Sequence, residues 1–136
     1  MAADDREFDL AAVLGAEREA STQILSLYIP NRNRHGRPID TRPWIREAQN
    51  ILTRIGEGST TTPPHDGGWE TAGGEVRREK TVIVYTYIKP DRFLAHLADL
   101  REFLHRFGRR TNQEVVVLEL SGPEASWFFR IKQYDA

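Results

Sequence analysis

Two segments with helical spacing of apolar residues alternate with strand-like segments, and this alternation limits the folds open to the chain. In residues 43–55 the apolar positions fall three or four residues apart, and Pro43 and Gly56 suit the first turn and the end of a helix. The same spacing recurs over residues 91–107, at Phe93, Leu97, Leu100, Leu104 and Phe107. The spacing predicts two amphipathic helices, the second ended by Gly108.

Three segments show the two-residue period of β-strands: residues 22–29, 75–88 and 113–120. In the clearest of them, valine, threonine and isoleucine occupy one face between positions 82 and 88, and Ile83, Tyr85 and Tyr87 occupy the other. A further alternating run over residues 126–131, which includes Trp127 and Phe129, predicts an edge strand.

Residues 56–74 hold six of the ten glycines. A structureless loop of this length is unusual in a compact domain, so we expect extended pieces near residues 60–62 and 69–72 and a hairpin turn at Gly73 and Gly74. The resulting order of elements predicts a ferredoxin-like α+β sandwich (βαββαβ), an antiparallel sheet with two helices on one face. An N-terminal helical extension over residues 1–20 precedes this single domain of residues 21–136.

Composition excludes several classes of site. The chain has no cysteine, which rules out disulfides, a thiol nucleophile and cysteine-bound zinc. The net charge of −1 makes nucleic acid an unfavourable partner. His96 and His105 fall on opposite sides of the second helix, so we expect neither a metal site nor a cofactor. The acidic N-terminus and the lack of a long apolar stretch predict a cytoplasmic protein without a membrane partner.

The sheet face opposite the helices is unusually apolar for a surface in contact with water. The residues expected to dominate it are Tyr28, Ile83, Tyr85, Tyr87 and Val117. The N-terminal helix, a second copy of the chain, or another protein, a ligand or RNA can cover such a face. We favour a homodimer through this face, with another protein partner as an alternative. The tyrosines also lie where RNA-recognition modules stack bases, but residues 80–85 lack the glycines of that signature.

The polar residues form a constellation and no known catalytic motif. Neither a Gly-x-Ser-x-Gly elbow nor a phosphate-binding loop is present. An arginine such as Arg42 at a helix N-terminus is disfavoured unless an anion is near, and His65 is followed by a carboxylate. We expect Trp69 to close the end of the core and Asn112 to lie in a turn. The candidate binding residues are Arg42, Thr60, Thr61, His65, Trp69, Arg77, Glu79, Asn112 and Gln113.

These observations favour a non-enzymatic binding or assembly module over an enzyme, and they assign no catalytic residue. The alternative is a small hydrolase or nuclease beside the glycine-rich segment, an idea that rests on Arg42, His65, Glu79 and Asn112. The third hypothesis for the function is that the open face of the sheet binds RNA.

Several short motifs carry a resemblance. They are Gly58-Ser59-Thr60-Thr61, Gly68-Trp69, Gly73-Gly74-Glu75-Val76, Glu79 and Thr111-Asn112-Gln113-Glu114-Val115. With these motifs, residues 24–120 resemble small bacterial families of ferredoxin-like proteins of unknown function. The motifs consist mainly of glycine and turn residues, so the resemblance implies a fold and no catalytic residue.

Overall fold

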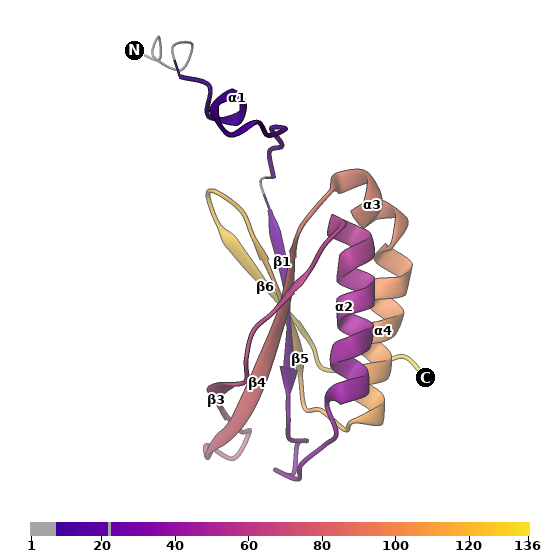
Figure 1. The fold of residues 1–136 in the computed structure, drawn as a ribbon. Coiled ribbons are helices and arrows are strands. Elements are labelled where there is room, and N and C mark those ends of the chain that lie inside the picture. Colours follow the sequence, from indigo (N-terminus) through magenta and orange to yellow (C-terminus); the bar gives the residue numbers. More distant parts are fainter. Residues whose placement is uncertain (1–7, 22) are drawn as a thin grey trace.

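The computed structural model describes residues 8–21 and 23–136 (Figure 1). Within them the strands are β1 Ile24–Pro30, β2 Thr60–Thr61, β3 His65–Glu70, β4 Val76–Tyr87, β5 Val116–Ser121 and β6 Ser126–Ile131. The helices are α1 Leu10–Leu14, α2 Arg42–Gly56, α3 Pro90–Ala95 and α4 Leu97–Arg110. The strands form one antiparallel sheet in the order β2-β4-β1-β5-β6, and β3 also pairs with β4. The predicted ferredoxin-like α+β sandwich is confirmed.

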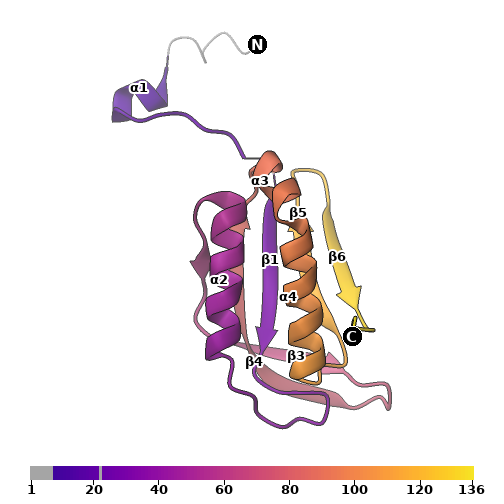
Figure 2. The same cartoon turned by 90° about the vertical axis from the view of Figure 1, so that its right-hand side faces the viewer.

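Helices α2 and α4 cover one face of the sheet, and the core lies between the two layers (Figure 2). The two-residue period of β1 buries Leu25, Leu27 and Ile29 under these helices, as the sequence predicts. Phe103 and Phe107 fill the helix side of the core. Among the described residues, no helix covers the opposite face of the sheet.

The second predicted helix is wrong in two details. It is broken into α3 and α4 at His96, whose backbone (φ −113°, ψ 12°) leaves the helical range. It also continues past Gly108 to Arg110. Gly108 is a packing position, since a Cβ there would lie 2.1 Å from Cε1 of Tyr134. The missing side chain makes room for the aromatic ring.

The glycine-rich segment is more ordered than the sequence indicates. The short strand near residues 60–62 is present as β2, but β3 begins at His65 and ends at Glu70, where residues 69–72 were expected to be extended. Gly67 and Gly68 lie inside the ladder, opposite Glu79 and Arg78. The hairpin turn lies where the two glycines predict it, but it is longer than two residues, because Thr71 N donates a hydrogen bond to Glu75 O and closes a loop over residues 72–74 in which Gly74 has φ 84°.

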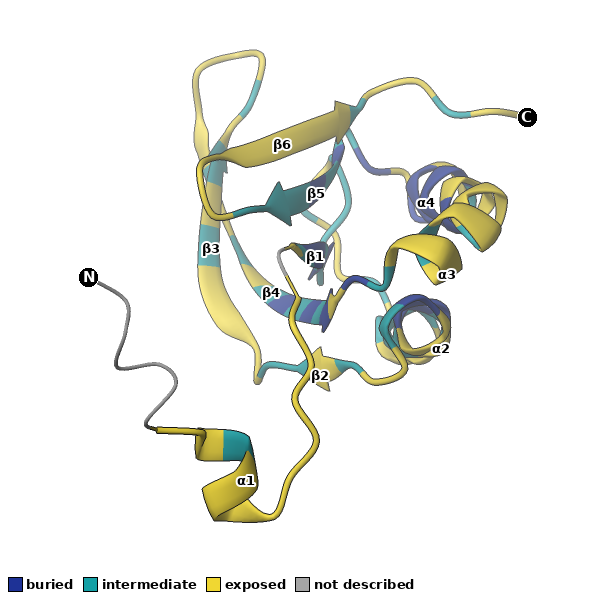
Figure 3. Ribbon diagram, turned by 90° about the horizontal axis from the view of Figure 1, so that it is seen from above, coloured by how far each residue is buried: buried dark blue, intermediate teal, exposed yellow. Residues whose placement is uncertain are grey.

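Helix α1 is one short turn that lies away from the sheet (Figures 1 and 3). The Asp9 carboxylate accepts a hydrogen bond from the backbone N–H of Ala12 at 3.2 Å, and Gly15 ends the helix with φ 66°. Phe8 and Leu14 are both more than 60% exposed, so α1 does not cover the open sheet face. Residues 1–7 of the predicted extension lie outside the described residues. Over the described chain, every helix is too short or too polar to cross a lipid bilayer.

Candidate functional site

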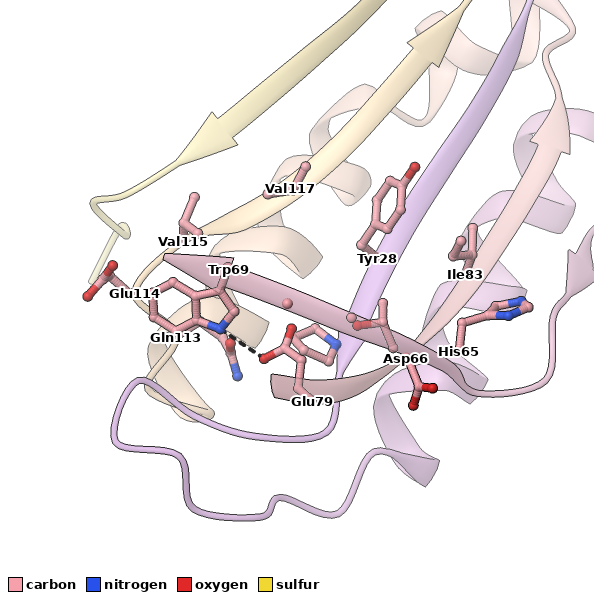
Figure 4. A pocket seen from close by; sticks show the side chains of 14 residues that line it. Tyr28, His65, Asp66, Trp69, Glu79, Ile83, Gln113, Glu114, Val115 and Val117 are labelled. Carbon is pink, nitrogen blue, oxygen red and sulfur yellow. Dashed lines mark hydrogen bonds between the residues drawn. The ribbon is translucent and has the colours of Figure 1, made fainter. Parts of the chain in front are cut away.

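A cavity of about 310 Å³ lies between the β3–β4 hairpin and the open face of the sheet (Figure 4). The hairpin crosses the ends of β1 and β5 on the side away from the helices, and this crossing forms the cavity roof (Figures 2 and 4). Apolar and aromatic side chains from the sheet form the floor: Tyr28, Ile83, Val115 and Val117. From the hairpin come His65, Asp66, Gly67, Gly68, Trp69, Glu79 and Thr81, and the remaining lining residues are Pro30, Gln113 and Glu114.

Glycine in the hairpin leaves space for this cavity. Gly67 is paired directly with Glu79, so a side chain at position 67 would project on the same face as the carboxylate. A Cβ at position 67 would lie 2.9 Å from Thr81 Oγ1 and 3.6 Å from Glu79 Cγ. The glycine therefore gives a ligand access to Glu79.

Glu79 carries the most distinctive electrostatics of the cavity. The indole Nε1 of Trp69 donates a hydrogen bond to Glu79 Oε1 at 3.1 Å. Burial raises the pKa of the Glu79 carboxyl above its ordinary value, while the Trp69 hydrogen bond, the hydroxyl of Thr81 and the charge of Arg32 partly oppose this rise. The result is a partly buried carboxyl that keeps its proton to a higher pH than a surface glutamate does.

A second polar contact fixes the cavity floor. The hydroxyl of Tyr28 on β1 donates a hydrogen bond to Glu119 Oε1 on β5 at 2.8 Å, and Ser121 Oγ donates to the other carboxylate oxygen at 2.9 Å. Burial and the neighbouring carboxylate raise the pKa of Tyr28 to about 12. Tyr28 is therefore a neutral donor at physiological pH.

The structure gathers four of the nine sequence-derived candidates in the cavity: His65, Trp69, Glu79 and Gln113. Trp69, expected at the end of the core, instead forms part of the cavity wall. Gln113 is buried and its side-chain amide donates to Arg32 O at 3.1 Å and to Thr111 Oγ1 at 3.2 Å, so it holds the neighbouring loop in place.

The remaining candidates lie outside the cavity lining. Arg42 is exposed and forms an ion pair with Asp40 at 3.0 Å, which supplies the anion that its helix position requires. Asn112 is exposed and occupies a turn with φ 53°, as its residue type predicts. Arg77 lies 6.0 Å from the ring centroid of Trp69, behind the cavity wall.

The two threonines have a structural setting on β2. Thr61 Oγ1 accepts a hydrogen bond from Gln49 Nε2 of α2 at 2.8 Å, and Thr60 is exposed beside Tyr85. Tyr85 and Tyr87, expected in a dimer face, pack edge-on at 6.4 Å outside the cavity lining.

Three residues of the expected dimer face, Tyr28, Ile83 and Val117, line the cavity, and the dimer through this face stays a prediction. Sequence reasoning missed Thr81, which lies two residues before Ile83 on the same strand face. The two-residue period alone contains this signal. Across residues 8–21 and 23–136, no cluster of three or more potential metal ligands is present.

Comparisons with known proteins give a match at the level of the fold. No family model matches the chain, and no curated protein matches it. The fold is similar to that of a phage SAM (S-adenosylmethionine) lyase, solved in complex with S-methyl-5'-thioadenosine, with a TM-score of 0.60, 13% identity and coverage of 88% of this chain and 98% of that chain. The apo form of a phage SAM lyase matches with a TM-score of 0.58, at the same identity and coverage.

These matches contradict the expected non-enzymatic module, because both similar solved structures are of an enzyme. The sequence shows neither carboxylates paired at helical spacing nor a nucleophile motif, so it gave no sign of an enzyme. The ferredoxin-like fold implied by the bacterial resemblance is confirmed, while membership of those bacterial families stays a prediction.

Proposed function

We propose that this chain is an enzyme that binds S-adenosylmethionine beneath the β3–β4 hairpin and cleaves it to 5'-methylthioadenosine. The observation that carries this proposal is Glu79, a partly buried carboxylate in a cavity with a largely apolar and aromatic floor. The likeness in fold to a SAM lyase supports the same assignment.

The cavity suits a sulfonium nucleoside in size and in charge. Its volume of about 310 Å³ falls within the range of small-molecule sites. Aromatic faces and a nearby carboxylate both attract an onium cation, and Trp69, Tyr28 and Glu79 provide these groups. The apolar floor offers a surface for the flat adenine ring.

Release of 5'-methylthioadenosine breaks the bond between the sulfonium sulfur and the γ-carbon of the aminobutyrate arm, and both bonding electrons pass to sulfur. Two routes complete the reaction. In one, a carboxylate oxygen of the substrate forms a bond to the γ-carbon and closes a lactone. In the other, a base takes a proton from the β-carbon and an alkene forms.

Both routes disperse the sulfonium charge on the way to a neutral thioether, so a cavity of low polarity favours the transition state over the bound substrate. Glu79 orients the sulfonium in the first route. In the second it is also the base, a role that suits a carboxyl whose pKa is raised by burial.

The test is to incubate the purified protein with S-adenosylmethionine and to quantify 5'-methylthioadenosine by chromatography, with a protein-free sample to correct for spontaneous cleavage. Glu79→Gln should slow product formation by about 100-fold or more. Glu70→Gln is the matched control, because Glu70 lies on the same hairpin, is exposed and does not line the cavity. This control should retain activity within about twofold.

Proton NMR of the four-carbon product distinguishes the lactone from the alkene, which are isomers. Calorimetric titration with 5'-methylthioadenosine should show similar affinity for the wild type and for Glu79→Gln, since the thioether carries no cation for Glu79 to attract. Absence of both product formation and binding would contradict the proposal.

The hydrolase or nuclease alternative has weaker support, because Arg42 and Asn112 lie outside the cavity that contains His65 and Glu79. The RNA-binding alternative stays a prediction. A substrate that is synthesised inside cells agrees with the cytoplasmic location expected from the sequence, which also stays a prediction.

A further inference from the structure

Strand β6 is an exposed edge of the sheet with an unusual run of aromatic residues. Trp127, Phe128 and Phe129 are 62%, 52% and 48% exposed, and in the described chain β6 pairs only with β5. Natural proteins usually protect such an edge with charges, proline or a covering segment, because its free N–H and C=O groups can pair with another strand. The three aromatic positions provide none of these protections.

We propose that β6 pairs antiparallel with β6 of a second copy of this chain, with the two-fold axis at Phe128. Across a two-fold axis between antiparallel strands, the two residue numbers of every opposed pair add up to twice the number of the residue on the axis. In this register Phe128 lies opposite itself, Ser126 opposite the partner's Arg130, and Trp127 opposite the partner's Phe129.

The hydrogen bonds of the β5–β6 hairpin support this register. The hairpin turn is closed by a bond from Gly122 N to Ala125 O at 2.9 Å, and Leu120 is paired with Trp127 and Leu118 with Phe129. Because antiparallel pairs alternate, the backbone groups of Trp127 and Phe129 point toward β5. Those of Ser126, Phe128 and Arg130 point outward, and the proposed register pairs all three in about six inter-chain hydrogen bonds.

The side chains also match across the axis. Trp127 and Phe129 share the sheet face of their buried neighbour Leu118, so the pairing places two Trp–Phe contacts on this face. Phe128 meets its own copy on the opposite face. A shift by two residues would place Phe128 opposite Ser126 or Arg130 and would break up these aromatic pairs.

The charged residues near the ends of β6 are also compatible with this pairing of two copies. Glu124 in the β5–β6 turn lies opposite the partner's Lys132, at both ends of the paired strands. Arg130 faces a serine, so no like charges oppose each other. The net charge of −1 adds little repulsion between whole copies. None of the described residues that line the cavity belongs to β6, so pairing of the copies and chemistry in the cavity can be tested separately.

The first experiment is light scattering or sedimentation equilibrium from about 1 to 200 µM protein. The wild type should have twice the mass of the 15.6 kDa chain. Glu124→Lys and Lys132→Glu should each weaken the dimer about tenfold or more, because each places like charges opposite one another at both ends. The double variant E124K/K132E exchanges the charges and should restore the wild-type affinity.

The second experiment uses the absence of cysteine in the chain. Opposed residues of a hydrogen-bonded antiparallel pair lie about 5.5 Å apart at Cα, a distance that a disulfide spans. Phe128→Cys should therefore form a covalent dimer under mild oxidation. Ala72→Cys, on the exposed β3–β4 turn, is the control and should cross-link at least about tenfold more slowly.

Three results would overturn the proposal. The first is a monomeric wild type over the whole concentration range. The second is a double charge exchange that fails to restore a dimer lost in the single variants. The third is a dimer that persists in both single variants and is lost in Tyr85→Asp, which would place the contact on the open sheet face. Cleavage of S-adenosylmethionine by the variants reports on the cavity independently.

Discussion

Trp69 and Glu79 lie diagonally across the β3–β4 hairpin, and the indole Nε1 donates a hydrogen bond to the carboxylate at 3.1 Å (Figure 4). This contact joins the wall of the cavity to its partly buried acid. It also partly opposes the rise that burial causes in the pKa of Glu79, because a donor favours the ionised form of an acceptor carboxylate.

Trp69→Phe should raise the pKa of Glu79 further, because the substitution removes a hydrogen bond to the charged form while the cavity stays apolar. An NMR titration of the Glu79 side-chain carboxyl carbon measures this change without reference to catalysis. Trp127→Phe is the control, since Trp127 lies on β6 outside the cavity, and should leave the titration unchanged. A Glu79 pKa that falls in Trp69→Phe would show that the indole acts mainly by excluding water.

Glu79 should also make folding stability depend on pH. A carboxyl whose pKa is higher in the folded than in the unfolded chain binds its proton more tightly when folded, so its contribution falls as pH rises through that window. Glu79→Gln removes the titrating carboxyl and with it this loss of folding stability at higher pH. The melting temperature of the variant, compared with that of the wild type, should therefore rise as the pH is raised from 4 to 7. Calorimetry measures this difference.

Asp66 provides a control of opposite sign for this prediction. The Lys80 ammonium lowers the pKa of the Asp66 carboxyl, so that group stabilises the folded chain above its unfolded pKa and loses this effect as pH falls. Asp66→Asn should be less stable than the wild type at pH 7, and this difference should vanish in acid. Equal pH profiles for Glu79→Gln and the wild type would contradict the assignment for Glu79.

The layered fold can be predicted from the sequence because local periodicity determines it. Leu25, Leu27 and Ile29 repeat every second residue and are buried, as expected for one face of a strand. The cavity could not be predicted in this way. Trp69 and Val115 line it together because the hairpin crosses the sheet, and no local pattern in the sequence specifies that crossing.

Glu79 shows why the candidate site was only partly recognisable. It belongs to the charged run Arg77, Arg78, Glu79 and Lys80, which is typical of the solvated rim of a hairpin. The strand period directs Glu79 and Lys80 to opposite faces, and the structure places Glu79 in the cavity while Lys80 is exposed. The charged composition of this run therefore predicted a solvated rim, whereas Glu79 lines a cavity because the hairpin crosses the open face of the sheet.

Tyr28→Phe should destabilise the fold by about 1 kcal/mol, because the Glu119 carboxylate would lose a partly buried hydrogen bond of 2.8 Å. For a chain of this size the melting temperature should fall by about 3 to 5 °C. Tyr87→Phe is the control at a tyrosine that is 54% exposed, and its effect should stay within about 0.5 kcal/mol. Thermal unfolding of both variants at neutral pH decides the comparison, and equal losses would show that the Tyr28 hydroxyl adds no stability.

Gly108→Ala should destabilise the chain by about 1 to 3 kcal/mol, since the added methyl would lie 2.1 Å from Cε1 of Tyr134 and would force the ring outward. Displacement of the ring would also break the hydrogen bond from the Tyr134 hydroxyl to Gln113 O, which is 2.9 Å long. In a chain that already carries Tyr134→Ala, the ring that the added methyl would clash with is absent. There, alanine should stabilise α4 by up to about 1 kcal/mol, because it is a better helix former than glycine. The effect of Gly108→Ala should thus change sign between the two backgrounds, which urea denaturation of the four proteins can measure. Equal losses in both backgrounds would mean that the glycine is required by the backbone of α4 and not by the ring of Tyr134.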